Sequence, residues 1–417
     1  MLQRGKHLVA ADRALATGGG LGARLFAGRF HSILDRIDGG VAEGRLHLTL
    51  PDGSFRVLGG NGEGPVAAVH IKSWRALARL AASGSVGWYK AWAYGEWTSP
   101  DPVALFDLFM RNAATLGDVA RAKGPWRLVN RLAHALRANG KRRARRNIAH
   151  HYDLGNDFYA AWLDAGMTYS SAIFAAPSDS LEAAQDHKVR LLLDRLDLKP
   201  GQHLLEIGCG WGGLAEIAAR DYGVHVTGLT LSSEQKAYAD GRLAEAGLRG
   251  RVTIELKDYR DVRGAFDAVA SVEMVEAVGQ EYWPAYLQTI ARVLKPGGKA
   301  ALQLISIREA LFENYAANTD FIQAYIFPGG LLLSEARFGA LAAAAGLSWH
   351  DRQGYGLDYA ETLERWRARY DEAVAARRLP DGFDAAFHEL WRYYLMYSEG
   401  GFRSGGIDVA QVTLAKS

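Results

Sequence analysis

The sequence contains little cysteine and no long apolar run, and both absences narrow the kinds of protein that it can encode. Cys209 is the single cysteine among 417 residues, which excludes a disulfide framework and a metal site built from cysteine thiolates. No window approaches the ~20 consecutive apolar residues that a membrane-spanning helix needs. The N-terminus has no apolar stretch followed by a small-residue cleavage site. These features predict a cytoplasmic protein whose membrane contact is peripheral.

Length and charge favour a protein of several domains with no general preference for polyanions. A chain of 417 residues is too long for one ordinary core. The net charge is only +3, so any preference for an anionic partner must come from local clustering. The apolar fraction of 49% and the charged fraction of 23% are typical of a folded protein.

The first hundred residues predict a small α+β domain. The stretch "RLHLTLPDGSFRVLG", residues 45–59, alternates apolar and polar residues on both sides of a Pro-Asp-Gly turn, as a β-hairpin does. A strand, an amphipathic helix and a glycine-broken aromatic segment follow in residues 67–97. The tryptophans and tyrosines of this region fit core packing, and an apolar groove that accepts a lipid is the alternative.

A basic stretch without any Asp or Glu follows at residues 121–146. Its apolar residues recur at helical spacing and would form one face of a helix, whereas most of its arginines lie off that face. Three interpretations compete: a solvated linker helix, a helix lying on an anionic membrane, and a segment that binds nucleic acid phosphates. The composition alone does not choose among them.

From about residue 200 the chain alternates strand-like and helix-like segments, as in "HLLEIGC" followed by "GGLAEIAARDYG". This alternation of strand-like and helix-like segments predicts an α/β fold with a doubly wound, mostly parallel sheet. In such folds the ligand lies beyond the carboxyl ends of the strands, where the strand order reverses. We therefore expect the functional site at that edge of the sheet.

The segment "LLEIGCGWGG", residues 204–213, places glycines directly after the first predicted strand and before a helix. Glycines let a ligand approach the backbone, and the helix N-terminus offers unpaired N–H groups. A dinucleotide site requires an acid after the second strand, where this chain has Thr230. Glu206 would repel a pyrophosphate but can meet the ammonium of a methionine moiety. S-adenosylmethionine is the better prediction.

Several motifs then give the chain a specific resemblance. It resembles the cyclopropane-fatty-acyl-phospholipid synthases and the related mycolic acid cyclopropane synthases. The motifs stand in family order: "HYDLGNDFYAAWLDAGMTYSSAIF" (151–174), the glycine loop, "VTGLTLSSEQ" (226–235), "EMVEAVGQEYW" (273–283), "YIFPGG" (325–330) and the tail "GGFRSGGIDVAQVTLAK".

The resemblance implies a Rossmann-like class I S-adenosylmethionine-dependent methyltransferase domain behind the small α+β domain. The expected division is residues 1–116 for the N-terminal domain, 117–146 for a basic helical linker and 147–417 for the catalytic domain. The linker then becomes a contact to phospholipid headgroups at the membrane surface. No nucleic acid partner and no metal is implied, and whether the chain forms a homodimer stays open.

The resemblance also implies two sets of site residues. The set expected to bind the cofactor is Tyr169, Ser170, Gly208, Gly210, Thr230, Leu231, Gln235, Asp258 and Tyr259. The set expected to hold a bicarbonate ion, which acts as the base, is Ser171, Glu276, Gln303, Ile305 and Tyr359. Many relatives carry Cys in place of Ser171 and His in place of Gln303. Ser and Gln still hydrogen-bond an anion, but the loss of the imidazole removes a titratable partner.

The implied reaction begins with the π electrons of a cis double bond, which attack the sulfonium methyl and leave a carbocation on the acyl chain. A site of this kind must exclude water and offers aromatic faces, for which Tyr169, Phe174, Tyr325, Phe327 and Tyr359 are candidates. Loss of a proton from the new methyl closes a cyclopropane ring.

Three alternatives remain. Loss of a proton from a neighbouring chain carbon gives a methyl-branched alkene without a ring. A small-molecule or RNA methyltransferase would require a polar acceptor site. A non-catalytic lipid- or S-adenosylmethionine-binding protein would follow if the substitutions had abolished the base.

Overall fold

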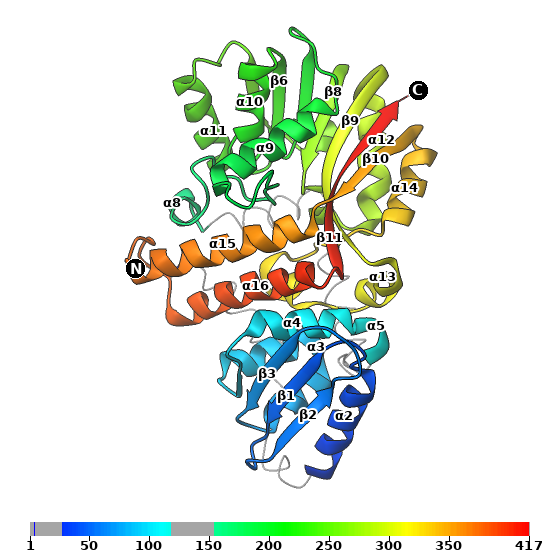
Figure 1. Ribbon diagram of the computed structural model, residues 1–417. Helices are drawn as coiled ribbons and strands as arrows, with labels where there is room; N and C mark the ends of the chain where they lie inside the picture. Colours follow the sequence, from blue (N-terminus) through cyan, green and yellow to red (C-terminus); the bar gives the residue numbers. More distant parts are fainter. Residues whose placement is uncertain (1–3, 5–26, 118–153, 417) are drawn as a thin grey trace. The chain divides into compact units, whose positions relative to one another are not determined.

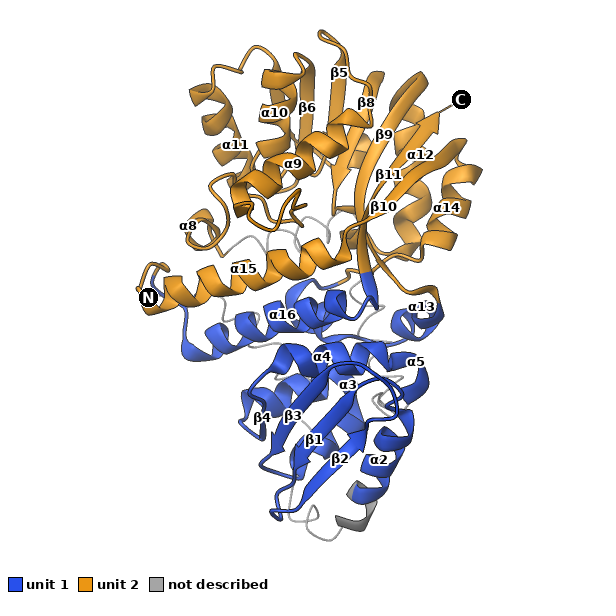
Figure 2. Cartoon of the chain, viewed as in Figure 1, with its two compact units in different colours: residues 1–137, 310–328, 381–407 blue, residues 138–309, 329–380, 408–417 orange. Residues whose placement is uncertain are grey.

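A computed structural model describes residue 4 and residues 27–117 and 154–416 of the chain. The chain forms two compact units, each assembled from separated segments (Figure 2). Unit 1 comprises the described parts of residues 1–137, with 310–328 and 381–407; unit 2 comprises those of 138–309, with 329–380 and 408–417. The predicted division into three consecutive parts stays a prediction, because most of its basic segment lies outside the described residues.

Unit 1 is built on a small four-stranded sheet with the order β2-β1-β3-β4. Its elements are α2 (Ala27–Gly40), β1 (Arg45–Thr49), β2 (Phe55–Gly59), β3 (Val66–Ile71), α3 (Arg75–Ala93), β4 (Trp97–Thr98), α4 (Pro102–Arg111), α5 (Ala113–Leu116), the single-turn π-helix η6 (Ile322–Ile326) and α16 (Ala385–Arg403). β1 and β2 pair antiparallel across the Pro-Asp-Gly turn, which confirms the predicted hairpin. Alternate residues of β1 are buried, as its sequence pattern requires.

An aromatic cluster joins the three chain segments of unit 1. Tyr393 of α16 lies 5.0 Å from Tyr89 of α3, 5.2 Å from Phe106 of α4 and 4.8 Å from Phe321, measured between ring centroids. Asp320 accepts hydrogen bonds from the hydroxyls of Ser85 and Tyr397, each at 2.7 Å. Segments about 300 residues apart in the chain therefore share one core.

Unit 2 contains a seven-stranded sheet with the order β10-β11-β9-β8-β5-β6-β7 (Figure 1). Its strands are β5 (His203–Ile207), β6 (His225–Thr230), β7 (Val252–Leu256), β8 (Phe266–Val272), β9 (Leu294–Ile307), β10 (Leu347–Gly354) and β11 (Ile407–Lys416). β5 pairs in parallel with both β6 and β8, and β10 pairs antiparallel with β11. The predicted α/β fold with a mostly parallel sheet is confirmed.

The helices of unit 2 precede, connect or follow these strands in the chain. They are α8 (Asn156–Ala160), α9 (Leu181–Asp194), α10 (Gly213–Asp221), α11 (Ser233–Glu245), η3 (Tyr259–Asp261), η4 (Val275–Ala277), η5 (Gln280–Tyr282), α12 (Trp283–Val293), α14 (Glu335–Ala344) and α15 (Gly356–Ala375); α13 (Glu309–Ala316) spans the boundary of the two units. The side chains of Ser180, Ser232 and Ser334 cap the N-termini of α9, α11 and α14. Apolar residues of α9, α10 and α11 form one core cluster with the sheet.

The strand order reverses beside β5, since the chain proceeds from β5 to β6 and β7 on one side and returns to β8 on the other. In α/β folds, ligands bind beyond the carboxyl ends of the strands at such a reversal, which here lies between β5 and β8. The glycine loop follows β5 and the acidic segment of residues 273–276 follows β8. Across residues 27–117 and 154–416, no helix combines the length and the hydropathy that crossing a bilayer requires.

Gly400→Ala is expected to destabilise unit 1. A methyl group at this position of α16 would lie 2.5 Å from the Cβ of Phe106 and 2.9 Å from the backbone nitrogen of Asp107. Overpacking of this kind costs about 1–3 kcal/mol, so we expect a lower Tm in thermal unfolding followed by circular dichroism.

The matched control is Gly241→Ala in α11, where an added methyl meets nothing within 4 Å. There alanine should raise the Tm slightly, because it is the better helix former by about 1 kcal/mol. A similar rise in both variants would contradict the close packing of α4 and α16.

Candidate active site

The glycine loop after β5 holds its backbone open to a ligand. Gly208 and Gly210 have φ angles of +86° and +51°, in the left-handed region that favours glycine. The N–H groups of Gly208 and Cys209 both donate to the carbonyl of Leu229, at 3.0 and 2.9 Å, which ties the loop to β6. A Cβ at Gly210 would meet nothing within 4 Å. One side of the loop therefore offers bare backbone.

Glu206 lies buried at the end of β5, directly before this loop. No donor within the described part of the chain reaches its Oε2. Burial raises the pKa of Glu206 to about 8, although the charge of Lys188 acts in the opposite direction. A buried carboxyl oxygen without a partner, beside open backbone, fits the ammonium of a methionine moiety. The residues present therefore suit S-adenosylmethionine.

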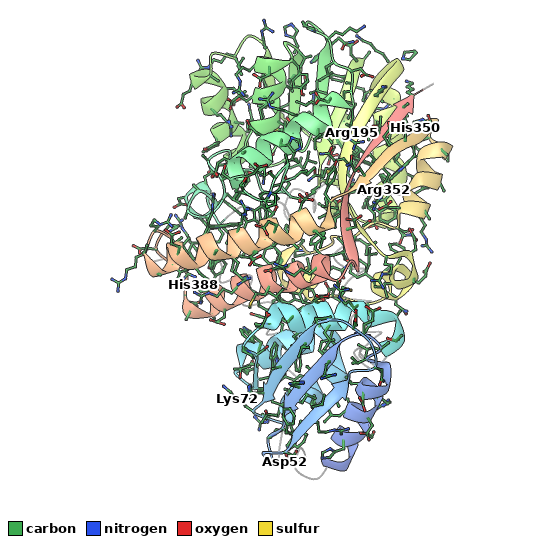
Figure 3. The ribbon with its side chains drawn as sticks, viewed as in Figure 1. Asp52, Lys72, Arg195, His350, Arg352 and His388 are labelled. Carbon is green, nitrogen blue, oxygen red and sulfur yellow. The ribbon has the colours of Figure 1, made fainter. Side chains whose placement is uncertain are left out.

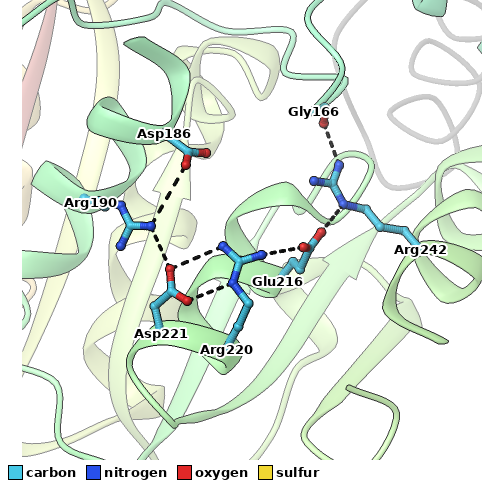
Figure 4. A network of polar contacts seen from close by, with 7 residues as sticks. All are labelled: Gly166, Asp186, Arg190, Glu216, Arg220, Asp221 and Arg242. Atoms are coloured by element: carbon cyan, nitrogen blue, oxygen red, sulfur yellow. Dashed lines mark hydrogen bonds and ion pairs between the residues drawn. The ribbon is translucent and has the colours of Figure 1, made fainter. Parts of the chain in front are cut away.

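The segment that carries Tyr169 and Ser170 is fixed by an aromatic cluster and by an ion-pair network. The Tyr169 ring lies 5.4 Å from Tyr159 and 5.3 Å from Trp366, between centroids. Arg242 of α11 contacts Glu216 of α10 and donates to the Gly166 carbonyl at 2.7 Å (Figure 4). The network therefore ties residues 164–170 to the helix that follows the glycine loop.

Thr230 and Gln235, both expected near the ribose, are joined to each other. The Thr230 hydroxyl donates to Oε1 of Gln235 at 2.9 Å and accepts from the backbone nitrogen of Ser232 at 3.1 Å. Both side chains are buried; Thr230 ends β6, and Leu231 is the next residue in the chain. The structure brings these three residues to the same strand end as the glycine loop.

Asp258 and Tyr259, expected beside the adenine, lie after β7 in a region that also contains Arg260. The Arg260 guanidinium donates to both carboxylate oxygens of Asp258, at 2.8 and 2.6 Å. Tyr259 is buried with its ring 5.5 Å from that of Tyr286, and burial raises the pKa of its hydroxyl to about 12. A role in binding adenine stays a prediction for both residues.

Glu273, which the sequence analysis did not assign to the site, connects three of the five residues expected to hold a bicarbonate ion. Its Oε1 accepts from the backbone nitrogen of Ser171 at 2.9 Å and from Nε2 of Gln303 at 2.8 Å. Its Oε2 accepts from the hydroxyl of Tyr359 at 2.8 Å. Burial raises the pKa of Glu273, and these hydrogen bonds and Lys188 counteract that rise. The side chains of Gln303 and Tyr359 therefore meet a carboxylate of the protein, as does the backbone of Ser171, whereas the Ser171 hydroxyl donates to the Ala172 carbonyl at 2.8 Å.

The other two members of that set, Glu276 and Ile305, contact each other. The backbone nitrogen of Ile305 in β9 donates to Oε1 of Glu276. Oε2 of Glu276 is sealed from solvent and has no partner within residues 27–117 and 154–416. Burial raises the pKa of Glu276 to about 8, and the neighbouring charge of Glu273 acts in the same direction.

A second layer of polar residues supports Gln303. Nε2 of Gln411 in β11 donates to Oε1 of Gln303 at 3.1 Å and to the carbonyl of Lys188 at 3.1 Å. Arg195, labelled in Figure 3, donates from Nε to Oε1 of Gln411 at 3.2 Å and from Nη1 to the Asp351 carbonyl at 2.6 Å. The side-chain amide of Gln303 has one donor group and one acceptor group. These contacts hold it in a single orientation.

The five aromatic residues proposed to face a carbocation divide between the units. Tyr169, Phe174 and Tyr359 belong to unit 2, where Tyr359 lies 6.1 Å from Trp366 and Arg365 lies over the Phe174 ring. Tyr325 and Phe327 belong to unit 1 and pack against Tyr89 and Tyr394. No cluster of His, Cys, Asp or Glu within the described residues is suited to a metal ion.

Comparison with known proteins places this geometry in context. A family model described as mycolic acid cyclopropane synthetase matches residues 139–412. The chain is 41% identical over 358 residues to the tuberculostearic acid methyltransferase of Mycobacterium tuberculosis, which covers 81% of this chain and 80% of that protein. It is 34% identical over 359 residues to the cyclopropane-fatty-acyl-phospholipid synthase of Escherichia coli K12, and the match covers 85% of this chain and 89% of that protein.

Solved structures agree with these matches. A cyclopropane synthase from Mycobacterium tuberculosis has a TM-score of 0.60 at 30% identity and covers 65% of this chain and 98% of its own. A mycolic acid cyclopropane synthase complexed with SAH and CTAB gives the same values. The resemblance and the class I methyltransferase fold predicted from the sequence are confirmed.

Glu276→Gln is expected to flatten the dependence of stability on pH. A carboxyl whose pKa is raised in the folded state stabilises the fold fully below about pH 4.5 and loses that contribution as the pH rises through about 8. The amide stays neutral and keeps an acceptor for Ile305. Thermal unfolding would be measured at pH 6, 7.5 and 9. Between pH 6 and 9 the Tm of the variant should rise relative to that of the wild type by roughly 2–4 °C, the shift produced by about 1 kcal/mol.

Other groups titrate over this range, but they are common to both proteins. Parallel curves of Tm against pH would therefore contradict a neutral Glu276 in the fold.

Proposed function

Since the chain belongs to the mycolic acid cyclopropane synthetase family and is an S-adenosylmethionine-dependent methyltransferase of lipid acyl chains, we propose that it alkylates the cis double bond of an unsaturated fatty acyl chain in a membrane phospholipid. When bound, S-adenosylmethionine supplies an electrophilic methyl group on a sulfonium. The protein must position the acyl chain, keep water away and accept one proton. Cytoplasmic localisation with peripheral membrane association is part of the proposal.

The observation that carries the proposal is the Glu273 carboxylate with its three donors. Ser171 and Gln303 both donate to Oε1, whereas Oε2 receives one hydrogen bond, from Tyr359. Oε2 therefore keeps the larger remaining capacity to accept a proton. We propose that Oε2 of Glu273 takes the proton released from the alkylated chain. Tyr359 and Gln303 hold that carboxylate in place.

A bicarbonate ion, implied by the family resemblance, is the alternative base. Glu276 and the Ile305 nitrogen would remain to help hold it, but Glu273 already engages donors from Ser171, Gln303 and Tyr359. A protonated Glu276 could donate to an ion, since burial raises its pKa to about 8. The two bases differ in mobility, because an ion diffuses into place whereas Glu273 is fixed to the backbone after β8.

The product depends on which hydrogen lies nearest to the base. We favour loss of a proton from a chain carbon, which gives a methyl-branched product without a ring. The 41% identical relative that is named as a methyltransferase supports this version. Cyclopropane formation is the second candidate, supported by the relative named as a cyclopropane-fatty-acyl-phospholipid synthase.

Product analysis tests this proposal. The protein would be expressed in a host that contains cis-monounsaturated phospholipids and lacks its own synthase, and the fatty acids would be examined by gas chromatography with mass spectrometry. We expect a species heavier by one CH2 that takes up hydrogen on catalytic hydrogenation. The same mass gain with resistance to hydrogenation would establish the cyclopropane instead. No mass change would overturn both and favour a binding protein.

Glu273→Gln is expected to lower kcat by roughly 10²–10⁴-fold, the usual contribution of a positioned general base. Binding of S-adenosylhomocysteine, measured by calorimetry, should change little because the amide preserves the shape of the side chain. Removal of bicarbonate from the buffer should leave the wild-type rate unchanged. Glu281→Gln, at an exposed acid of the neighbouring η5, is the matched control and should keep full activity.

If bicarbonate removal abolished the wild-type reaction while Glu273→Gln remained active, the ion would be the base and Glu273 would not.

A further inference from the structure

Helix α9 carries two polar side chains on the face that it buries. The buried positions are Leu181, Ala184, Gln185, Lys188, Val189, Leu192 and Leu193, which recur at helical spacing. Gln185 and Lys188 are one turn apart and interrupt an otherwise apolar stripe. Lys188 is only 1% exposed. A lysine is almost never buried to this extent without a specific partner.

Both polar side chains hold the same residue, Ser170. Nζ of Lys188 donates to the Ser170 hydroxyl at 2.7 Å, and Nε2 of Gln185 donates to the Ser170 carbonyl at 2.9 Å. The hydroxyl and the backbone of Ser170 are therefore both fixed from α9. The next residue, Ser171, donates its backbone N–H to Glu273.

The ammonium of Lys188 also faces three acidic side chains on three different segments. Glu273 follows β8, Asp164 lies in the loop after α8, and Glu206 is the last residue but one of β5; each interacts electrostatically with Lys188. Asp164 and Glu206 are buried, and Glu273 is partly buried. Within the described residues, Ser170 supplies the one acceptor at hydrogen-bond distance from Nζ. Lys188 thus acts on these acids through its charge and on Ser170 through contact.

We propose that Lys188 is a positioning residue of the cofactor site, which orients the Ser170 hydroxyl by direct contact and compensates the charge of Glu273, Glu206 and Asp164 from one buried point. The proposal rests on the proposed function, since it treats Ser170 as a cofactor contact and Glu273 as the base. It predicts two separable effects, one on cofactor binding through Ser170 and one on the pH dependence through Glu273.

The first effect is tested with a double-mutant cycle on S-adenosylhomocysteine binding by calorimetry. Lys188→Met keeps the length of the side chain and removes its charge, and Ser170→Ala removes the acceptor. Each single variant should weaken binding by roughly 10- to 100-fold, as expected for a hydrogen bond to a charged group. The double variant should bind S-adenosylhomocysteine at most about twofold more weakly than the single variant with the lower affinity. The reason is that both changes break the same interaction.

The second effect is tested in the pH profile of kcat/KM. The groups that face Lys188 are Glu273, Asp164 and Glu206, and Glu273 is faced in turn by Glu276 and Tyr359. Loss of the ammonium removes a charge that favours the ionised form of Glu273, so its pKa should rise. The acidic limb of the profile should therefore move to higher pH in Lys188→Met, and Lys188→Arg should restore part of the shift. Ser170→Ala should leave the limb in place.

Arg190→Met is the matched control, because it removes an exposed cation from the same helix that pairs with Asp221 and does not touch Ser170 (Figure 4). It should bind S-adenosylhomocysteine as the wild type does. If Lys188→Met does not fold, Ser170→Ala still tests the contact, and unchanged binding in that variant overturns the proposal.

Effects of Lys188→Met and Ser170→Ala that multiply in the double variant would also overturn it. A wild-type protein that fails to bind S-adenosylhomocysteine would instead refute the proposed function itself.

Discussion

An ionised carboxylate that leaves water for a protein interior loses several kcal/mol of hydration unless hydrogen bonds or an opposite charge compensate it. Unit 2 places Glu206 at the end of β5 and Glu273 after β8, on the two strands between which the strand order reverses. The surrounding contacts follow from this placement. Glu273 receives three hydrogen bonds, and the ammonium of Lys188 acts on both acids. The strand ends where the order reverses therefore gather acidic side chains, whose ionised forms would be favoured by a cationic sulfonium beside them.

The arrangement joins two chemical tasks in one network. In the proposed function, the glycine loop and Glu206 meet the cofactor, whereas Glu273, held by Tyr359 and neighbouring Glu276, accepts the proton. Ser170 and Ser171 are adjacent in the chain, and one contacts Lys188 while the other contacts Glu273. A shift of this dipeptide would therefore disturb both tasks together.

The sequence predicted those features that depend on local pattern. The alternation of strands and helices, the hairpin of unit 1 and the glycine loop after β5 follow from the periodicity of apolar residues and from the turn residues. The family resemblance assigned Ser171, Gln303 and Tyr359 to the site, and the structure brings all three to Glu273, although their role stays a prediction. Glu273 lies in a quoted motif but was not assigned, because its partners are 102, 30 and 86 positions away in the chain. An acid that directly follows a buried strand was the available signal.

Lys188 was missed for a different reason, since a lysine in an amphipathic helix normally lies on the solvent side, and only the packed structure shows which face is buried.

The assembly of unit 1 from distant segments also constrains how the protein is made. Phe106 and Tyr89 find their partner Tyr393 only when α16 has left the ribosome. At ~5–20 residues per second, the roughly 290 residues between them take about 15–60 s to synthesise. During that interval the surfaces of Tyr89 and Phe106 that Tyr393 later covers stay exposed. A chain that terminates before residue 381 keeps Phe321 and Tyr325 as partners of Tyr89 but lacks α16, so the surface that α16 covers would remain open to aggregation.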